Sequence, residues 1–261
     1  LRAKARNGLM LEAKGPGSWA TLSLATGEAR ARGTVLIRGG GAPAVSLAVS
    51  QFIRTANSMA WKSTAQLAPW AEGGGVASLG LSQFDGQIAA SNARYDIAGA
   101  LVAEGSFGSL AFNEGRANFA VTSQTQAMAT SLTTRLCLAV SAKNLVYQTT
   151  SMPHFAARLC PDAKGKLATL RNGRPLFFGS LALDPITAQI GDGTNTQTIA
   201  IGNAIFSTEA GPQGNASRVS LPSVDIAYPL ANGGTSNLSW ESAGGTIRAD
   251  GAGGWLFDGA L

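Results

Sequence analysis

The feature that most constrains this chain is a period of two, in which apolar residues alternate with small or polar ones over short segments. Successive side chains of a β-strand point to opposite faces, so each such segment places its apolar residues on one face of a sheet. Patterns with a helical period are nearly absent. The alternation is clearest over residues 20–24, 45–50, 136–140, 198–201 and 224–228.

Turn-forming pairs separate the alternating segments and predict the connections between strands. Asn-Gly and Asp-Gly supply the positive φ that tight hairpins need. One segment, 57–70, has the best helical spacing, with Ser58 as a candidate cap, although a strand followed by a loop also fits it. The expected turns are Gly39-Gly40-Gly41, Gly73-Gly74-Gly75, Asp85-Gly86, Asn172-Gly173, Asp192-Gly193, Asn232-Gly233 and Gly253-Gly254.

These patterns together predict an all-β fold: a long, curved, mostly antiparallel sheet with a groove and few or no helices. No Pro- or Ser-rich linker divides the chain, so residues 1–261 are expected to form a single elongated β-domain. The chain begins at Leu1 without an initiator Met and stops at Leu261 within an alternating segment. We therefore expect a fragment of a longer protein.

The face opposite the large apolar residues is unusual, because Ala, Ser, Thr, Gly and Asn stand where Lys and Glu are common. Only 13% of the residues are charged, whereas 45% are hydrophobic. This composition excludes a disordered tail. The longest apolar run, Leu136 to Val140, is far too short to span a bilayer as a helix.

The net charge of +5 is concentrated in two basic segments. Residues 1–62 hold nine Lys and Arg against two acids, and residues 143–174 hold six against one. Aromatic residues do not alternate with these cations, so no nucleic acid is expected as a partner. Two separate basic patches fit an anionic surface such as lipid head groups, and also fit ordinary solvated strand edges.

Residues for catalysis are scarce, and no enzymatic activity, cofactor or metal is expected. His154 is the only histidine, and no phosphate-binding loop or nucleophile motif occurs. A carbohydrate-active enzyme is a less favoured alternative, which requires clustered acids such as Asp96 and Glu114 beside aromatic residues in a cleft. The tryptophans available as sugar platforms are Trp61, Trp70, Trp240 and Trp255.

The two cysteines, Cys137 and Cys160, are the sharpest local feature. Each follows an Arg-Leu pair, and two strands joined by a return near residues 144–154 would place them side by side. A disulfide between them would indicate an oxidising compartment such as the periplasm. Two buried free thiols remain the alternative.

The sequence pattern of this chain resembles that of the AsmA-like proteins, in particular the YdbH/TamB branch of Gram-negative bacteria. The resemblance rests on the alternating strands, the Gly-rich turns, the Phe84-Asp85-Gly86 step after Leu79-Gly80-Leu81-Ser82, and Leu159-Cys160-Pro161 after a strand. It implies a periplasmic β-structure rolled around an apolar groove, in a full-length protein anchored in the inner membrane. It also implies phospholipid transport between the inner and outer membranes during outer-membrane biogenesis.

We therefore expect a lipid-binding segment whose apolar groove holds acyl chains of a phospholipid or another lipid, while basic residues meet the head group. A closed β-sandwich or β-helix core, as in a structural or adhesive module of a secreted surface protein, remains the alternative. The head-group candidates are Arg30, Arg32, Arg38 and Arg174. The groove candidates are Leu22, Leu24, Val45, Leu47, Leu79, Leu81, Phe112, Phe119, Leu136, Leu138, Ile199, Ile201, Ile226 and Tyr228.

Overall fold

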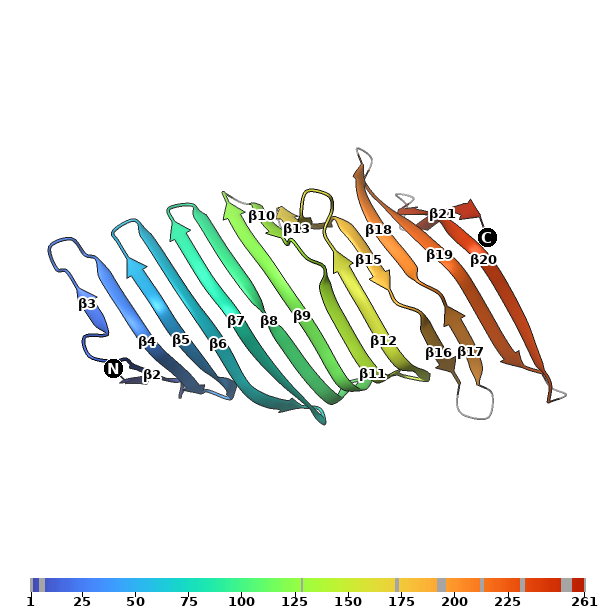
Figure 1. Cartoon of the computed structure of the whole chain (residues 1–261), viewed down its shortest axis with the longest axis horizontal. Coiled ribbons are helices and arrows are strands. Elements are labelled where there is room, and N and C mark those ends of the chain that lie inside the picture. The colour runs from blue at the N-terminus through green and yellow to red at the C-terminus, as the bar shows by residue number, and fades with distance from the viewer. Residues whose placement is uncertain are drawn as a thin grey trace.

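The chain forms one open antiparallel sheet of 21 strands. The computed structural model describes residues 2–4, 8–127, 129–171, 174–191, 196–211, 214–230, 233–249 and 255–260, and no helix occurs among them. The strands lie side by side, and the two chain ends lie at opposite ends of the sheet (Figure 1). The expectation of an all-β chain with one long antiparallel sheet is confirmed.

The first half of the sheet is a meander of long strands, in which each strand from β4 to β9 pairs with the next. Bulges at Ser50 and Ser82 each insert one extra residue. Both serine hydroxyls donate to a carbonyl of the following strand, at Lys62 and Ala98. The strands are β1 (Arg2–Lys4), β2 (Met10–Lys14), β3 (Ala20–Leu22), β4 (Ala29–Gly39), β5 (Ala42–Arg54), β6 (Ser58–Glu72), β7 (Gly75–Ala89), β8 (Asn92–Phe107) and β9 (Leu110–Gln126).

The second half contains mostly shorter strands, although β19 and β20 are as long as the long strands of the first half. The sheet first forks at β9, whose last residues pair with β10 and whose first residues pair with β11. The strands are β10 (Ala129–Thr133), β11 (Leu138–Tyr147), β12 (Thr150–Cys160), β13 (Lys166–Arg171), β14 (Arg174–Phe177), β15 (Gly179–Leu183), β16 (Ile186–Ile190), β17 (Gln197–Ile201), β18 (Ala204–Gly211), β19 (Gly214–Pro229), β20 (Thr235–Ala249) and β21 (Trp255–Ala260).

Two short strands in succession occupy the place of one long strand in this half. β15 and β16 together lie along β12, and β17 and β18 together lie along β19. Pro185 separates the first pair, and proline cannot donate a hydrogen bond to the ladder. The segment 202–203 separates the second pair, where the Gly202 amide still donates to the carbonyl of Ser223.

Of the two readings left open for residues 57–70, the strand is the one found, and the turn predicted at Asp85-Gly86 is wrong. Residues 57–70 lie largely in β6 rather than in a helix, because their apolar side chains join cross-strand rows on one face. Asp85-Gly86 lies inside β7 rather than in a turn. Gly86 is needed there because a Cβ would overlap the ring of Trp61, its cross-strand partner.

The sheet is a single layer. Among the described residues, strands make substantial contacts only with their hydrogen-bonded neighbours, apart from a small contact between β14 and β18. The chain exposes 16601 Å² of surface, whereas a compact monomer of 26.6 kDa exposes about 10,700 Å². The strands therefore form neither a β-sandwich, which needs two packed sheets, nor a β-helix, which needs parallel pairing.

Candidate functional site

The register of β2 to β18 assembles a continuous row of apolar side chains across the sheet, which we call the apolar row. Directly paired residues share one face, so the row runs perpendicular to the strands. It crosses eleven strands, which corresponds to about 48 Å at the usual strand spacing. Its members are Leu11, Ile37, Val45, Leu67, Leu79, Leu101, Ala117, Val140, Ala157, Leu183 and Ala204.

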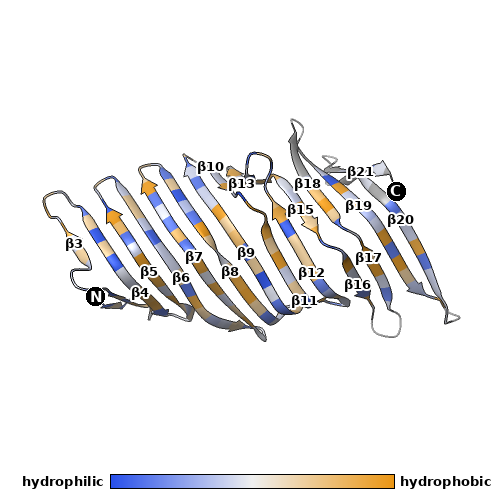
Figure 2. Ribbon diagram, viewed as in Figure 1, coloured by the Kyte–Doolittle hydropathy of each residue, from blue (hydrophilic) through white to orange (hydrophobic). Residues whose placement is uncertain are grey.

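A second row lies beside it on the same face, which we call the apolar face. Over β2 to β9 it consists of Ala13, Val35, Leu47, Ala65, Leu81, Gly99 and Phe119. Over β11 to β19 it consists of Leu138, Leu159, Leu181, Phe206 and Val219. Figure 2 shows the resulting alternation of hydrophobic and hydrophilic residues along the strands.

The apolar face is packed laterally, because aromatic rings lie over small residues of the neighbouring strand. Trp61 covers Gly86, and its ring centroid lies 6.0 Å from that of Phe84 and 5.9 Å from that of Tyr95. Near the ends of β8 and β9, the rings of Phe107 and Phe112 stack at 5.6 Å. Of the two rows, Ala65 is 6% exposed and Val219 is 8% exposed. Most of the large aliphatic side chains of the rows are half-buried, and no described layer covers this face.

The opposite face, which we call the polar face, carries small and charged residues. Its central row is Ser46, Gln66, Gly80, Ala100 and Asn118. Ion pairs on this face include Arg94 with Asp96 and Arg158 with Asp184. The hydrogen bonds from Arg94 lower the pKa of Asp96, against a smaller opposing effect of burial. Glu114, at a bulge in β9, has its pKa lowered by the hydrogen bond from Lys143.

The described part of the polar face is hollowed rather than flat. A hollow of about 740 Å³ crosses β5 to β9 and is lined mainly by Ala, Gly, Ser and Thr. A second one of about 730 Å³ adjoins it, sharing Ala98, Ala120 and Leu136, and is lined by cationic and amide side chains. Short side chains in the middle of the face, with longer ones around them, account for these depressions.

The predicted groove residues fall into three groups. Val45, Leu47, Leu79, Leu81, Phe119 and Leu138 lie in the two rows of the apolar face. Ile199 and Ile201 pair with Ile226 and Val224 in a second cluster that Tyr228 extends. Phe112 pairs with Gly105 near the start of β9.

Leu22, Leu24 and Leu136 stand apart from these groups. Leu22 pairs with Ala29 at the edge of the sheet, and Leu24, in the following loop, is 91% exposed. Leu136 is 72% exposed and lines the hollows of the polar face. Only it, Leu81 and Phe119 among the fourteen predicted residues line the hollow of about 740 Å³.

Arg30, Arg32 and Arg38, predicted to meet a head group, all lie on the polar face of β4, because their neighbours Val35 and Ile37 lie on the apolar face. Arg30 pairs with Glu28 at 2.6 Å. Arg30 and Arg32 line a hollow of about 270 Å³ together with Trp19. The side chain of Arg174 lies outside the described residues. Arg30, Arg32 and Arg38 therefore lie on the side of the sheet opposite the apolar row, and not along the rim of that row.

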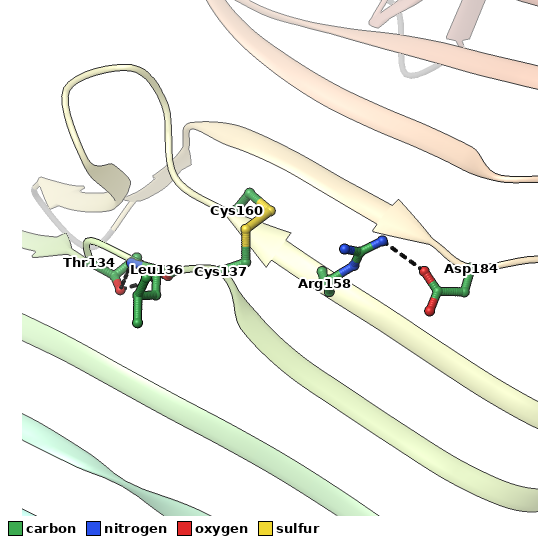
Figure 3. The surroundings of a disulfide bond; sticks show 6 residues. All are labelled: Thr134, Leu136, Cys137, Arg158, Cys160 and Asp184. Atoms are coloured by element: carbon green, nitrogen blue, oxygen red, sulfur yellow. Dashed lines mark hydrogen bonds and ion pairs between the residues drawn. A yellow bond between two sulfur atoms is a disulfide. The ribbon is translucent and has the colours of Figure 1, made fainter.

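Cys137 and Cys160 form a disulfide between the start of β11 and the end of β12 (Figure 3). The register pairs Leu138 with Leu159, which brings the two cysteines together. Thr134, nearby, is buried, and its hydroxyl lies within hydrogen-bond distance of the carbonyl oxygens of Ala120 and Leu136, at 2.6 and 2.8 Å. The disulfide thus joins the paired strands β11 and β12 at the end where β12 leads into the loop before β13.

The acids and tryptophans considered for carbohydrate cleavage do not gather. Asp96 pairs with Thr122, whereas Glu114 lies eight residues earlier in β9, beside Lys143. Trp61 and Trp70 lie on the apolar face. Trp240 pairs with Val224, and the side chain of Trp255 lies outside the described residues.

His154 is exposed opposite Lys143. Among the residues that the structure describes, no three His, Cys, Asp or Glu side chains could hold a metal ion. In the same part of the chain, no helix is long and apolar enough to cross a membrane.

Sequence reasoning missed several members of the apolar row, including Ile37, Leu67, Leu101 and Leu183. These residues lie outside the clearest alternating segments, and Ile37 and Leu101 stand in consecutive apolar runs that do not show which face each residue takes. Only the register shows that they continue one another. It also missed the loop cations Arg135 and Lys164, which lie far apart in the sequence and line one hollow. No protein-family model, no curated protein and no solved structure matches this chain.

Proposed function

We propose that this chain is a non-enzymatic lipid-carrying segment, in which phospholipid acyl chains lie against the apolar face. The observation that carries the proposal is the apolar row, which crosses eleven strands without an interposed charge or a covering layer among the described residues. Exposed apolar surface of this extent marks an interaction site in soluble proteins.

The chemistry of the face favours acyl chains over a ligand with many polar groups. On the apolar face of β4 to β9, only a few hydroxyl groups, such as those of Ser63 and Ser123, interrupt the apolar side chains. The charged residues Arg54 and Glu72 lie near the ends of their strands. Each methylene that leaves water contributes about 0.8 kcal/mol. A long chain can therefore bind without specific contacts, and can shift along the row at little cost.

The proposed setting is the periplasm of a Gram-negative bacterium, with transfer between the inner and outer membranes. The disulfide supports an oxidising compartment. The length of the row, about 48 Å, exceeds the thickness of one bilayer leaflet and suits a carrier that spans aqueous space.

The test is lipid extraction and native mass spectrometry of the purified chain, repeated with two matched double variants. Leu79→Gln with Leu101→Gln interrupts the apolar row, whereas Ser78→Gln with Val102→Gln changes the adjacent pair on the polar face. We expect phospholipid to co-purify with the wild type and the second variant, and to be reduced about tenfold in the first. Circular dichroism confirms that both variants fold. Absence of bound lipid from the wild type, after reconstitution with phospholipid vesicles, would overturn the proposal.

A further inference from the structure

The second hollow of the polar face has the features of a binding site of its own. It lies over β8 and β9, on the side of the sheet opposite the apolar row, and has a volume of about 730 Å³. Its charged lining consists of Arg94, Arg135, Lys164 and Asp96. It is thus independent of the face on which the proposed function rests.

The charge of this hollow is unbalanced. Arg94 donates to both carboxylate oxygens of Asp96, at 3.0 and 3.1 Å, so these two charges neutralise each other. Arg135 and Lys164 have no carboxylate partner among the described residues. The described lining therefore keeps two uncompensated positive charges beside the amide side chain of Gln124.

The two cations are carried by loops whose backbones are held together. The Thr134 amide donates to the Gly165 carbonyl at 2.8 Å, which ties the loop of Arg135 to the loop of Lys164. Asp162 Oδ1 accepts hydrogen bonds from the amides of Lys164 and Lys166, at 2.9 and 2.8 Å, and fixes the second loop.

The disulfide lies directly after Leu136 in the first loop and directly before Pro161 in the second (Figure 3). It constrains both loops at their junction with β11 and β12. A rim that is fixed before the ligand arrives loses little conformational entropy on binding.

We infer that this hollow binds a phosphate ester, with Arg135 and Lys164 as the cations that meet the phosphoryl oxygens. A guanidinium and an ammonium together supply charge-assisted hydrogen bonds, which are the stronger kind. The rest of the ester lies over the adjoining hollow, whose small residues leave room for a polar carrier such as glycerol or a sugar. The phosphoryl group belongs either to a soluble ester or to a phospholipid head group.

The experiment measures binding of glycerol 3-phosphate by calorimetry and of phosphatidylglycerol vesicles by co-sedimentation, using the whole chain. We expect saturable binding that Arg135→Gln with Lys164→Gln weakens about tenfold or more. Arg116→Gln removes another exposed cation of the polar face, outside the hollow, and is expected to leave binding unchanged. Binding of glycerol 3-phosphate assigns the site to soluble esters, and binding of vesicles alone assigns it to a head group.

Two results would overturn the inference: no saturable binding of either probe, or an equal loss in the Arg116→Gln variant, which would indicate general charge attraction. A further variant, Cys137→Ala with Cys160→Ala, is expected to weaken binding several-fold by loosening both loops. Co-purification of acyl lipid should be the same in the Arg135/Lys164 variant as in the wild type. Failure of this site is thus distinguishable from failure of the apolar face.

Discussion

The two faces of strands β4 to β9 share one backbone and differ in almost everything else. Leu101 and Val102 are consecutive residues, yet Leu101 lies between Leu79 and Ala117 in the apolar row, whereas Val102 lies between Ser78 and Arg116. One face is held by lateral apolar packing, and the other by exposed ion pairs and short side chains. We therefore expect stability and lipid binding to depend on the apolar face, and charge-dependent behaviour to depend on the polar face.

The largest expected effect comes from placing the same charge on each face. Leu101→Glu buries a carboxylate among aliphatic side chains, and we expect it to lower the free energy of unfolding by about 3–4 kcal/mol. Val102→Glu, at a site that is 44% exposed beside Arg116, should change it by less than about 0.5 kcal/mol. Urea denaturation measures both, and equal losses would contradict the distinction between the faces.

Removing the disulfide should test whether the polar face contributes to stability without contributing to lipid binding. Cys137 and Cys160 are 23 residues apart, and opening a loop of this size costs about 3 kcal/mol in the chain-entropy account. We expect Cys137→Ala with Cys160→Ala to lower the unfolding midpoint while phospholipid still co-purifies. Loss of lipid from a variant that remains folded would show that the two faces are coupled.

Adding a methyl group to one glycine on each face should change stability by a smaller amount, and by different amounts on the two faces. A Cβ on Gly86 would overlap Trp61 on the apolar face, so Gly86→Ala should cost about 2 kcal/mol through overpacking. On the polar face, a Cβ on Gly80 would meet only the side-chain oxygen of Gln66, at 3.2 Å. Because that exposed side chain can move, Gly80→Ala should change the unfolding free energy by less than about 0.5 kcal/mol, measured in the same urea titrations.

The smallest expected effect on stability is the loss of the Arg94–Asp96 ion pair of the polar face at low pH. Arg94 lowers the pKa of Asp96 below its ordinary value of 3.8, so the pair stabilises the fold above that pH. This contribution is lost as the pH falls through the lowered pKa, and it amounts to less than about 1 kcal/mol because the pair is partly exposed. Thermal melts between pH 2 and 6 should show a shallower acid decline for Asp96→Asn, and identical profiles would refute the contribution.

Local patterns made some features predictable and left others out of reach. The strand character of β5 and β11 follows from alternation that is visible in the residues themselves. Turns at Ala90 and Gln148 were not predictable from composition, because both adopt positive φ without being Gly, Asn or Asp. The helical spacing of residues 57–70 did not predict their conformation, because pairing with β5 and β7 holds this segment in a strand.

The all-β character of the chain, and the apolar side of the alternating strands, follow from the residues alone, because alternation is a local property of neighbouring residues. The tertiary fold sets which residues of different strands lie opposite one another, and hence joins single leucines and valines into one row. It also decided that the sheet stays open and that Arg135 and Lys164 share a hollow. Register and loop proximity arise from pairing between distant segments, and no local pattern records them.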